Sequence, residues 1–210
     1  AEWLAIVDGV WHTPRFSFQG TYYGVDEAVL EPKPVRQPRP AIYAGGESDA
    51  AKRLISQTCD AYAMHGDPPD RVAPKIADMR ARRESLELPP LQFAMAAYVI
   101  VRENEQAAQR ELERITNVQP GSPGYSNYQE WIQHTQLEQR VSLEDYSVSN
   151  RGLRAGLVGT PEQVADRIRE FAAAGVDVLL LQCSPQFEEM ERFAETVIPL
   201  VAQSGLGRAA

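Results

Sequence analysis

The sequence predicts an α/β fold with a parallel sheet, and three features of its 210 residues support this prediction. Short apolar runs alternate with amphipathic helical segments along most of the chain, which is typical of βαβ units. The run at 92–101 is almost entirely apolar, as expected of a strand that is covered on both faces. Further on, Thr160-Pro161-Glu162-Gln163 has the pattern of a capping box, and a strand-like run of Val and Leu follows at 176–183.

The elements can be assigned in chain order. A helix is predicted over 2–12, followed by a hairpin over 16–23 that turns at Gln19-Gly20 and by a proline-rich connector over 32–40. Four parallel strands are predicted, at 41–45, 60–65, 92–101 and 177–183. Helices with one apolar face are predicted at about 48–57, after 66–69, and at about 103–115, 125–139 and 161–174. The final helix begins after Ser184-Pro185, with Phe187, Met190, Phe193 and Val197 on one side.

Four strands are half the number in a closed (β/α)8 barrel, so two architectures remain open. One is a small open, doubly wound sheet. The other is the C-terminal half of a (β/α)8 TIM barrel, with residues 1–210 forming a portion of one barrel domain. In that case the segment 117–158 is an insertion before the last βα unit, and 141–155 is expected to act as a lid because it is long and polar.

Composition excludes several classes of protein. The net charge of −8 is opposite to that of a protein that binds nucleic-acid phosphates. No apolar run approaches the roughly 20 residues of a membrane helix, and no secretory signal is visible in the sequence as given. Cys59 and Cys183 lie far apart, and His12, His65 and His134 lack the spacing of metal ligands. We therefore expect a cytoplasmic protein with reduced cysteines, no metal site, and neither a membrane nor a nucleic acid as partner.

Several segments resemble the bacterial luciferase-like flavin monooxygenases. The matching segments keep the order and spacing of the family from about residue 1 to 202, and they lie at 36–48, 60–69, 157–165 and 182–190. Within the family, the alkanesulfonate and dimethyl sulfone monooxygenases are the most similar sub-groups. The segment 136–152 is similar to the sulfone sub-group and not to the sulfonate one. The resemblance implies a (β/α)8 barrel whose first four strands are not in this sequence.

The resemblance also implies an activity. Members of the family use O2 and reduced FMN, which a separate NAD(P)H-dependent flavin reductase supplies. This implies an FMNH2-dependent, two-component monooxygenase that oxidises a small neutral organosulfur compound, dimethyl sulfone, to methanesulfinate and formaldehyde, and that forms a homo-oligomer (dimer or tetramer). Two alternatives within the family are an alkanesulfonate-type monooxygenase and a non-catalytic barrel that binds flavin or deazaflavin. A Rossmann-like module is a third alternative, but it requires a GxGxxG turn that Gly45-Gly46-Glu47 does not provide.

Two groups of residues are candidates for binding the flavin. Gly45, Gly46, Glu47 and Ser48 stand between a predicted strand and a predicted helix, where free amides and the helix dipole favour an anion. On the residues alone this is either a plain glycine turn with Ser48 as N-cap or a phosphate site, and the resemblance implies the FMN phosphate. Ser184 faces the flavin or caps the last helix, and these two roles are compatible.

Three residues are candidates for catalysis. His65, at the end of the second strand, is either a group that handles protons or contacts substrate or a hydrogen-bonded residue of the barrel rim. Sulfonate enzymes carry arginine and histidine at the positions of Ala96 and Tyr98. Here the cation is lost and Tyr98 can donate one hydrogen bond, which suits a neutral sulfone; alternatively both side chains only fill the barrel. Arg151 lies near the position of a loop arginine that closes over the flavin, or it is simply solvated.

Overall fold

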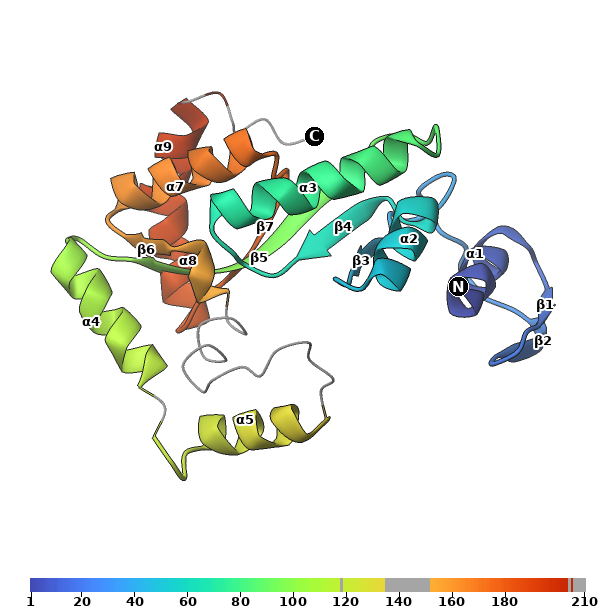
Figure 1. Cartoon of the computed structure of the whole chain (residues 1–210), viewed down its shortest axis with the longest axis horizontal. Coiled ribbons are helices and arrows are strands. Elements are labelled where there is room, and N and C mark those ends of the chain that lie inside the picture. The colour runs from blue at the N-terminus through green and yellow to red at the C-terminus, as the bar shows by residue number, and fades with distance from the viewer. Residues whose placement is uncertain (118, 135–151, 204, 206–210) are drawn as a thin grey trace. The chain divides into compact units, whose positions relative to one another are not determined.

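Figure 1 shows the computed structural model, which describes residues 1–117, 119–134, 152–203 and 205. The chain forms two compact units. The first unit consists of Ala1–Tyr62 with Met79–Leu91, and the second of Ala63–Asp78 with Gln92–Ala210. Helix α3 (Pro69–Glu84) contributes residues to both.

The first unit begins with a helix that packs against a hairpin. Helix α1 (Glu2–His12) precedes the antiparallel strands β1 (Phe16–Gln19) and β2 (Gly24–Ala28). The Glu2 carboxylate accepts hydrogen bonds from the three backbone amides of the turn between these strands, at 2.8, 2.9 and 3.1 Å. These bonds, first among them the one from Tyr22, lower the pKa of Glu2. The predicted helix over 2–12 is confirmed. A hairpin is present as predicted, but it spans 16–28 and not 16–23, and its turn lies at 20–23 and not at Gln19-Gly20.

The proline-rich connector after the hairpin is fixed at both ends. Lys33 Nζ donates to the carbonyls of Val10 and Thr13 at 2.8 and 2.7 Å, which caps the C-terminal end of α1. At the other end, Arg39 pairs with the Asp60 carboxylate. These contacts engage the charged groups of Lys33 and Arg39, which have no carboxylate partner within the connector. They hold the connector at both ends, so it has a defined path although it contains no strand or helix.

Strand β3 (Tyr43–Gly45) and helix α2 (Asp49–Thr58) complete this unit. Its buried apolar side chains are Ile55, Cys59, Ala61, Tyr62, Met79 and Leu91. The side chain of Arg83 is buried among them, and its guanidinium donates to the carbonyls of Ser56 and Pro89 at 2.6 Å each. The guanidinium thus satisfies carbonyls at the end of α2 and in the loop before the next strand.

The remaining strands of the sheet are β4 (Ala61–Met64), β5 (Gln92–Val101), β6 (Leu157–Gly159) and β7 (Val178–Gln182). The strand order is β3-β4-β5-β6, and β7 also pairs with β5. The long strand β5 pairs in parallel with β7 over 94–98 and with β6 over 99–101. Strands that neighbour one another in chain order are typical of a barrel, so the doubly wound alternative is wrong. Strand β6, only three residues long, was not predicted.

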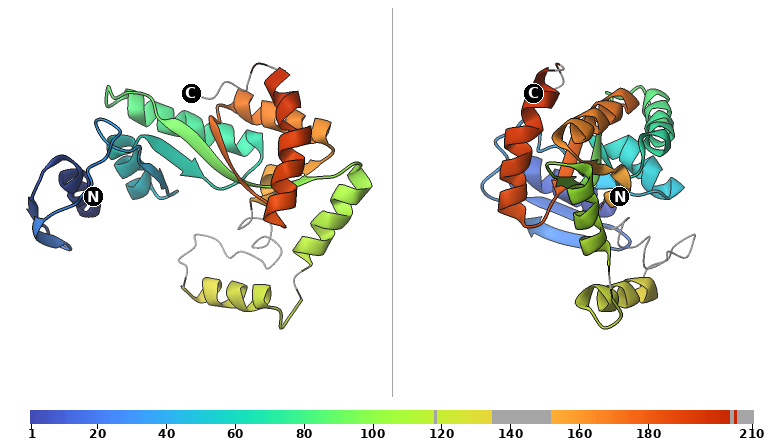
Figure 2. Two further views of the ribbon diagram at one scale, coloured as in Figure 1. Left: turned by 180° about the vertical axis from the view of Figure 1, so that it is seen from behind. Right: turned by 90° about the vertical axis from the view of Figure 1, so that its left-hand side faces the viewer.

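Five helices and one 3-10 turn of the second unit are described. They are α4 (Glu105–Thr116), α5 (Pro123–His134), η1 (Leu153–Ala155), α7 (Pro161–Ala174), α8 (Gln186–Thr196) and α9 (Ile198–Gln203). The predicted capping box is confirmed, because Thr160 Oγ1 accepts from the Gln163 amide and Gln163 Oε1 accepts from the Thr160 amide. Figure 2 shows α7 (orange) and α9 (red) packed side by side.

Helix α8 does not bury the apolar stripe that its sequence predicts. Val197, just after the helix, is fully buried, but Phe187 and Met190 are 70% and 55% exposed. The residue of α8 that turns inward is Glu189, which is 5% exposed and pairs with Arg102. Phe193 is partly buried and lines a pocket with Leu179 and Leu181 of β7, so the apolar stripe is covered only toward its C-terminal end.

Among the residues that the structure describes, no helix is both long and apolar enough to cross a membrane. The same residues contain no group of three or more His, Cys, Asp or Glu side chains that could hold a metal ion.

Candidate functional site

The predicted phosphate turn lies in the first unit, where β3 ends at Gly45 and α2 begins at Asp49. Ser48 is the N-cap of α2, and its hydroxyl oxygen accepts from the Ala51 amide at 3.2 Å. Gly46 has φ +156°, and a Cβ there would lie 2.6 Å from the Ala51 Cβ, so the turn requires glycine. The Tyr62 hydroxyl donates to the Gly46 carbonyl at 3.2 Å and fixes the orientation of that peptide.

The electrostatics of this turn suit an anion. The first turn of α2, which follows the glycines directly, carries backbone amides without a partner inside the helix and the positive end of the helix dipole, and Ser48 engages the amide of Ala51. Asp49 adds a negative charge there, but Arg53 and Arg82 pair with it at 3.0 and 2.9 Å. Glu47 and Ser48 are exposed, which leaves the turn accessible. The arrangement can therefore receive a phosphate through its backbone.

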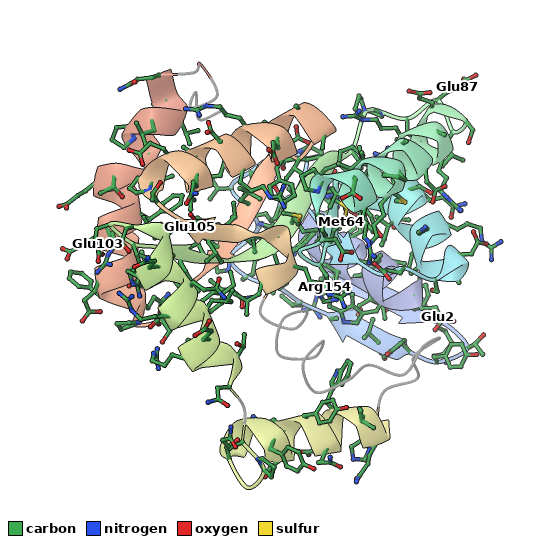
Figure 3. All side chains as sticks on the ribbon, turned by 60° about the vertical axis from the view of Figure 1, so that its left-hand side comes forward. Glu2, Met64, Glu87, Glu103, Glu105 and Arg154 are labelled. Carbon is green, nitrogen blue, oxygen red and sulfur yellow. The ribbon has the colours of Figure 1, made fainter. Side chains whose placement is uncertain are left out.

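The other candidate residues that the structure describes lie in the second unit. His65 follows β4, and its side chain is exposed. The next residues are fixed: Gly66 is buried, and Asp67 pairs with Lys75 at 2.8 Å and lies 4.0 Å from Arg154. Figure 3 labels Arg154 in η1 and Met64, the last residue of β4. His65 thus stands on a well-anchored loop with its ring open to solvent.

Tyr98 and Ala96 lie on β5 and differ in exposure. Tyr98 is 7% exposed and packs with Ile100, Ala108 and Leu153 in an apolar cluster. Ala96 is partly exposed, unlike the buried residues on either side of it along the strand. The structure thus places an uncharged, methyl-sized side chain at the partly exposed position of β5, and the buried Tyr98 lies two residues further along the same face of the strand.

Ser184 does not cap the last helix, which corrects that prediction. The N-cap of α8 is Pro185, which has no side chain able to cap, and Ser184 stands one residue earlier and is exposed. Proline has no hydroxyl to accept from the helix amides, so the first turn of α8 depends on other contacts. The hydroxyl of Ser184 is therefore not engaged as a cap.

Those other contacts form an ion-pair network that the sequence did not reveal. Arg102 NH1 lies 2.8 Å from the Glu189 carboxylate and 2.7 Å from the Val101 carbonyl, to which Arg192 also donates at 3.2 Å. The network joins the end of β5 to the first turn of α8. Burial, reinforced by the charge of Glu189, raises the pKa of the neighbouring Cys183 thiol. Charged residues far apart in a sequence give no signal of such pairing.

The predicted site residues that the structure describes belong to both units. Gly45, Gly46, Glu47 and Ser48 form one turn in the first unit, while His65, Tyr98 and Ser184 follow or lie on strands of the second. Arg151 and most of the predicted lid lie outside the described residues. Sequence analysis did not identify Gly66 and Gly152 of the second unit as site residues, although they directly follow the predicted site residues His65 and Arg151.

Comparison with known proteins decides the family. A family model of the luciferase-like monooxygenases matches residues 1–178. The chain belongs to this family. An FMNH2-dependent dimethylsulfone monooxygenase of Pseudomonas putida is 30% identical to this luciferase-like chain, across 96% of the chain and 57% of the relative. A protein of the same name from Pseudomonas fluorescens (strain Pf0-1) is 29% identical with the same coverage. The chain thus spans 57% of the length of each of these relatives.

Solved structures agree with the predicted half-barrel. Long-chain alkane monooxygenase LadA superimposes with a TM-score of 0.76 at 17% identity, covering 100% of this chain and 56% of LadA. DmoA from Hyphomicrobium sulfonivorans gives a TM-score of 0.69 at 17% identity, covering 100% of this chain and 55% of DmoA. At this identity the likeness concerns the fold. It confirms that the luciferase-like chain has the architecture of one part of a larger barrel.

Proposed function

We propose that this chain belongs to an FMNH2-dependent monooxygenase that oxidises a small neutral organosulfur compound, with dimethyl sulfone as the first candidate. The observation that carries the proposal is the 30% identity, across 96% of the chain, to a relative named for that reaction. The uncharged stretch of β5 around Ala96 supports the neutral substrate. An NAD(P)H-dependent flavin reductase and O2 are the partners that the reaction requires, and a dimer or tetramer is the assembly that we expect.

The turn at 45–48 is the proposed site of the FMN phosphate. Three features support this fit. Gly46 has no room for a Cβ, the N-terminal turn of α2 is exposed, and the charge of Asp49 is paired with Arg53 and Arg82. Glu47 contributes only its backbone, because its carboxylate would repel a phosphate. Ser48 can donate its hydroxyl proton to the phosphate while its oxygen caps the helix. Ser184 is the proposed second contact to the cofactor.

The substrate face of β5 is proposed to exclude anions. Among the residues that the structure describes, three cations of the second unit already pair with carboxylates: Lys75 with Asp67, Arg102 with Glu189, and Arg114 with Glu111. A buried sulfonate would lose several kcal/mol of hydration, and these cations would have to leave their carboxylates to compensate for it. A sulfone has no net charge, and one donor such as the Tyr98 hydroxyl satisfies one of its oxygens.

The reaction balances as dimethyl sulfone, O2 and FMNH2 giving methanesulfinate, formaldehyde, water, FMN and one proton. When bound, reduced FMN activates O2 and delivers one oxygen atom to a methyl carbon. The hydroxymethyl sulfone so formed must lose its hydroxyl proton before the C–S bond breaks. His65 is proposed to accept that proton, because histidine is the commonest general base in proteins and its exposed ring follows the end of β4.

The test is turnover with a flavin reductase, measured both on this chain and on the protein as its host makes it. Formaldehyde and methanesulfinate should appear in equal amounts and only when dimethyl sulfone is present. A competition between dimethyl sulfone and methanesulfonate then tests the neutral substrate. Oxidation of methanesulfonate with a similar or higher kcat/KM would refute it, and a lack of product from either compound would refute the proposed activity.

A further inference from the structure

Gly66 packs against β5 at a point that has no room for a side chain. A Cβ on Gly66 would lie 2.5 Å from the Ala96 carbonyl oxygen and 2.8 Å from the Gly152 carbonyl oxygen. Both neighbours are backbone atoms, so no change of side-chain rotamer could relieve the contact. Only glycine allows the loop after β4 to approach β5 this closely.

Gly152 meets the same stretch of β5 from another part of the chain. Its φ is +71°, and a Cβ there would lie 2.7 Å from Ala97 Cα and 2.9 Å from Tyr98 N. Its carbonyl oxygen accepts a hydrogen bond from the Tyr98 amide at 3.2 Å. A side chain at this position would therefore be strained in its backbone and would also force apart a hydrogen-bonded contact.

The two glycines together continue one edge of the sheet. The Ala96 carbonyl and the Tyr98 amide belong to residues two apart, so they face the same edge of β5. The other edge of β5 pairs with β7 over 94–98 and with β6 over 99–101, and the Phe93 carbonyl accepts there from the Asp177 amide at 2.9 Å. Strand β4, the neighbour of β5 in the sheet order, ends at Met64. Beyond that residue, backbone of the two glycine segments covers the edge that β4 leaves open.

Side chains anchor both partners of this contact. Asp67 pairs with Lys75 at 2.8 Å and lies 4.0 Å from Arg154, so one carboxylate links the loop after β4 to η1. In η1, Leu153 is 5% exposed and Ala155 is fully buried. The 3-10 turn is thus held in the core, and its position on β5 is fixed.

We propose that Gly66 and Gly152 are positioning residues, which hold His65 and Tyr98 in place for the substrate. This inference rests on the proposed function. Gly66 fixes the loop on which His65 stands, and Gly152 fixes both that loop and the backbone of Tyr98. An alanine at either glycine would separate the loop from β5 and move His65 relative to Tyr98.

NMR of the 210-residue chain tests this without relying on activity. The variant Gly152→Ala should shift the ring resonances of His65, which lies far away in the sequence, and should leave those of His12 in the other unit unchanged. The variant His65→Gln assigns the signal. An unchanged His65 resonance in Gly152→Ala would overturn the inference.

The chain offers a matched control. Gly121 has φ +85°, so alanine meets the same kind of backbone strain there, but a Cβ on Gly121 would have no heavy atom within 4 Å. Gly121→Ala should leave His65 unshifted, and an equal shift in this variant would refute the proposed contact. If Gly152→Ala does not fold, Asp67→Asn loosens the same contact without adding atoms and should shift His65 in the same experiment.

Steady-state kinetics of the protein as its host makes it then separates positioning from folding. Gly66→Ala and Gly152→Ala should lower kcat/KM for dimethyl sulfone at least roughly tenfold, with an unchanged Kd for FMN. If the Kd for FMN and the Tm change together with kcat/KM, the glycines are merely structural and the inference fails. If the wild-type protein does not oxidise dimethyl sulfone but His65 still shifts in Gly152→Ala, the proposed function fails while the contact stands.

Discussion

The glycine turn at 45–48 and the contact of Gly66 and Gly152 with β5 differ in the sequence separation of the residues that hold each of them in place. The cap of Ser48 and the steric limit on Gly46 both come from Ala51, within the same short segment. Gly66, by contrast, is limited by Ala96 and Gly152, which belong to distant parts of the chain. A short segment specifies most of the first arrangement, with one distant contact from the Tyr62 hydroxyl to the Gly46 carbonyl, whereas the second exists only when the sheet has formed. The two regions should therefore respond differently to substitution.

The largest expected effect concerns a long-range support of the second unit. Glu189→Gln leaves Arg102 half-matched in a buried network, and we expect the free energy of unfolding to fall by about 3 kcal/mol. Urea denaturation measures this. Arg114→Gln removes an exposed partner of Glu111 and should lower the stability much less, because solvent screens this pair. Equal losses in the two variants would show that the network does not stabilise the fold.

The phosphate turn should respond in ligand binding instead. Ser48→Asp places a negative charge beside the proposed phosphate, and we expect the Kd for FMN to rise at least about tenfold, or 1.4 kcal/mol. Ser48→Asn keeps the helix cap without the charge and should bind FMN nearly as well as the wild type. Isothermal titration with FMN provides the measurement. An unchanged Kd in Ser48→Asp would remove this turn from the site.

A smaller effect tests how the turn is held. Tyr62→Phe removes the hydroxyl that donates to the Gly46 carbonyl and should lower the free energy of unfolding by about 1 kcal/mol. Tyr22→Phe, on a ring that is 85% exposed, is the matched control and should have no effect. Thermal denaturation of both variants measures the two stabilities. If Tyr62→Phe is as stable as Tyr22→Phe, the peptide of Gly46 is held by its own segment alone.

The smallest effect depends on pH. Burial would raise the pKa of Asp60, but the hydrogen bond from Arg39 and the one from the Ile42 amide outweigh it, so its pKa is lowered below 3.8. The stabilisation is therefore fully present above the unfolded pKa and is lost as the pH falls through the folded one. Asp60→Asn should be less stable than the wild type at pH 7, by less than about 1 kcal/mol because the side chain is 43% exposed.

This difference in stability should shrink as the solution is acidified. Denaturation midpoints of the two proteins at pH 7 and at successively lower pH give the comparison. A difference that grows on acidification would mean that the carboxylate is not the stabilising form.

Local patterns in the sequence predicted the elements well. The capping box at Thr160 was recognisable because it depends on residues within one turn. The hairpin was recognised as well, but it extends to Ala28 and turns at 20–23, later than the predicted turn at Gln19-Gly20. Strand β6 was missed because three residues are too few to show a period. The capping role of Ser184 was wrong because the helix begins one residue later, after Pro185.

Contacts between distant segments could not be predicted. The burial of Glu189 in place of Phe187 depends on Arg102, whose approach follows from the sheet. The packing of Tyr98 against Leu153 likewise depends on where η1 lies on β5. The candidate phosphate turn was therefore identified from the sequence, while the environment of His65 and Tyr98 required the structure.

The way η1 is held has an evolutionary consequence. Helix α4 follows directly from β5, and Gly152 returns the chain to the same strand. Both ends of the intervening stretch are thus tied to one rigid element, and the free energy of closing a loop rises only slowly with its length. Residues can be added to or removed from that stretch without shifting the register of the sheet. Insertions and deletions in this stretch should therefore be tolerated without loss of the sheet.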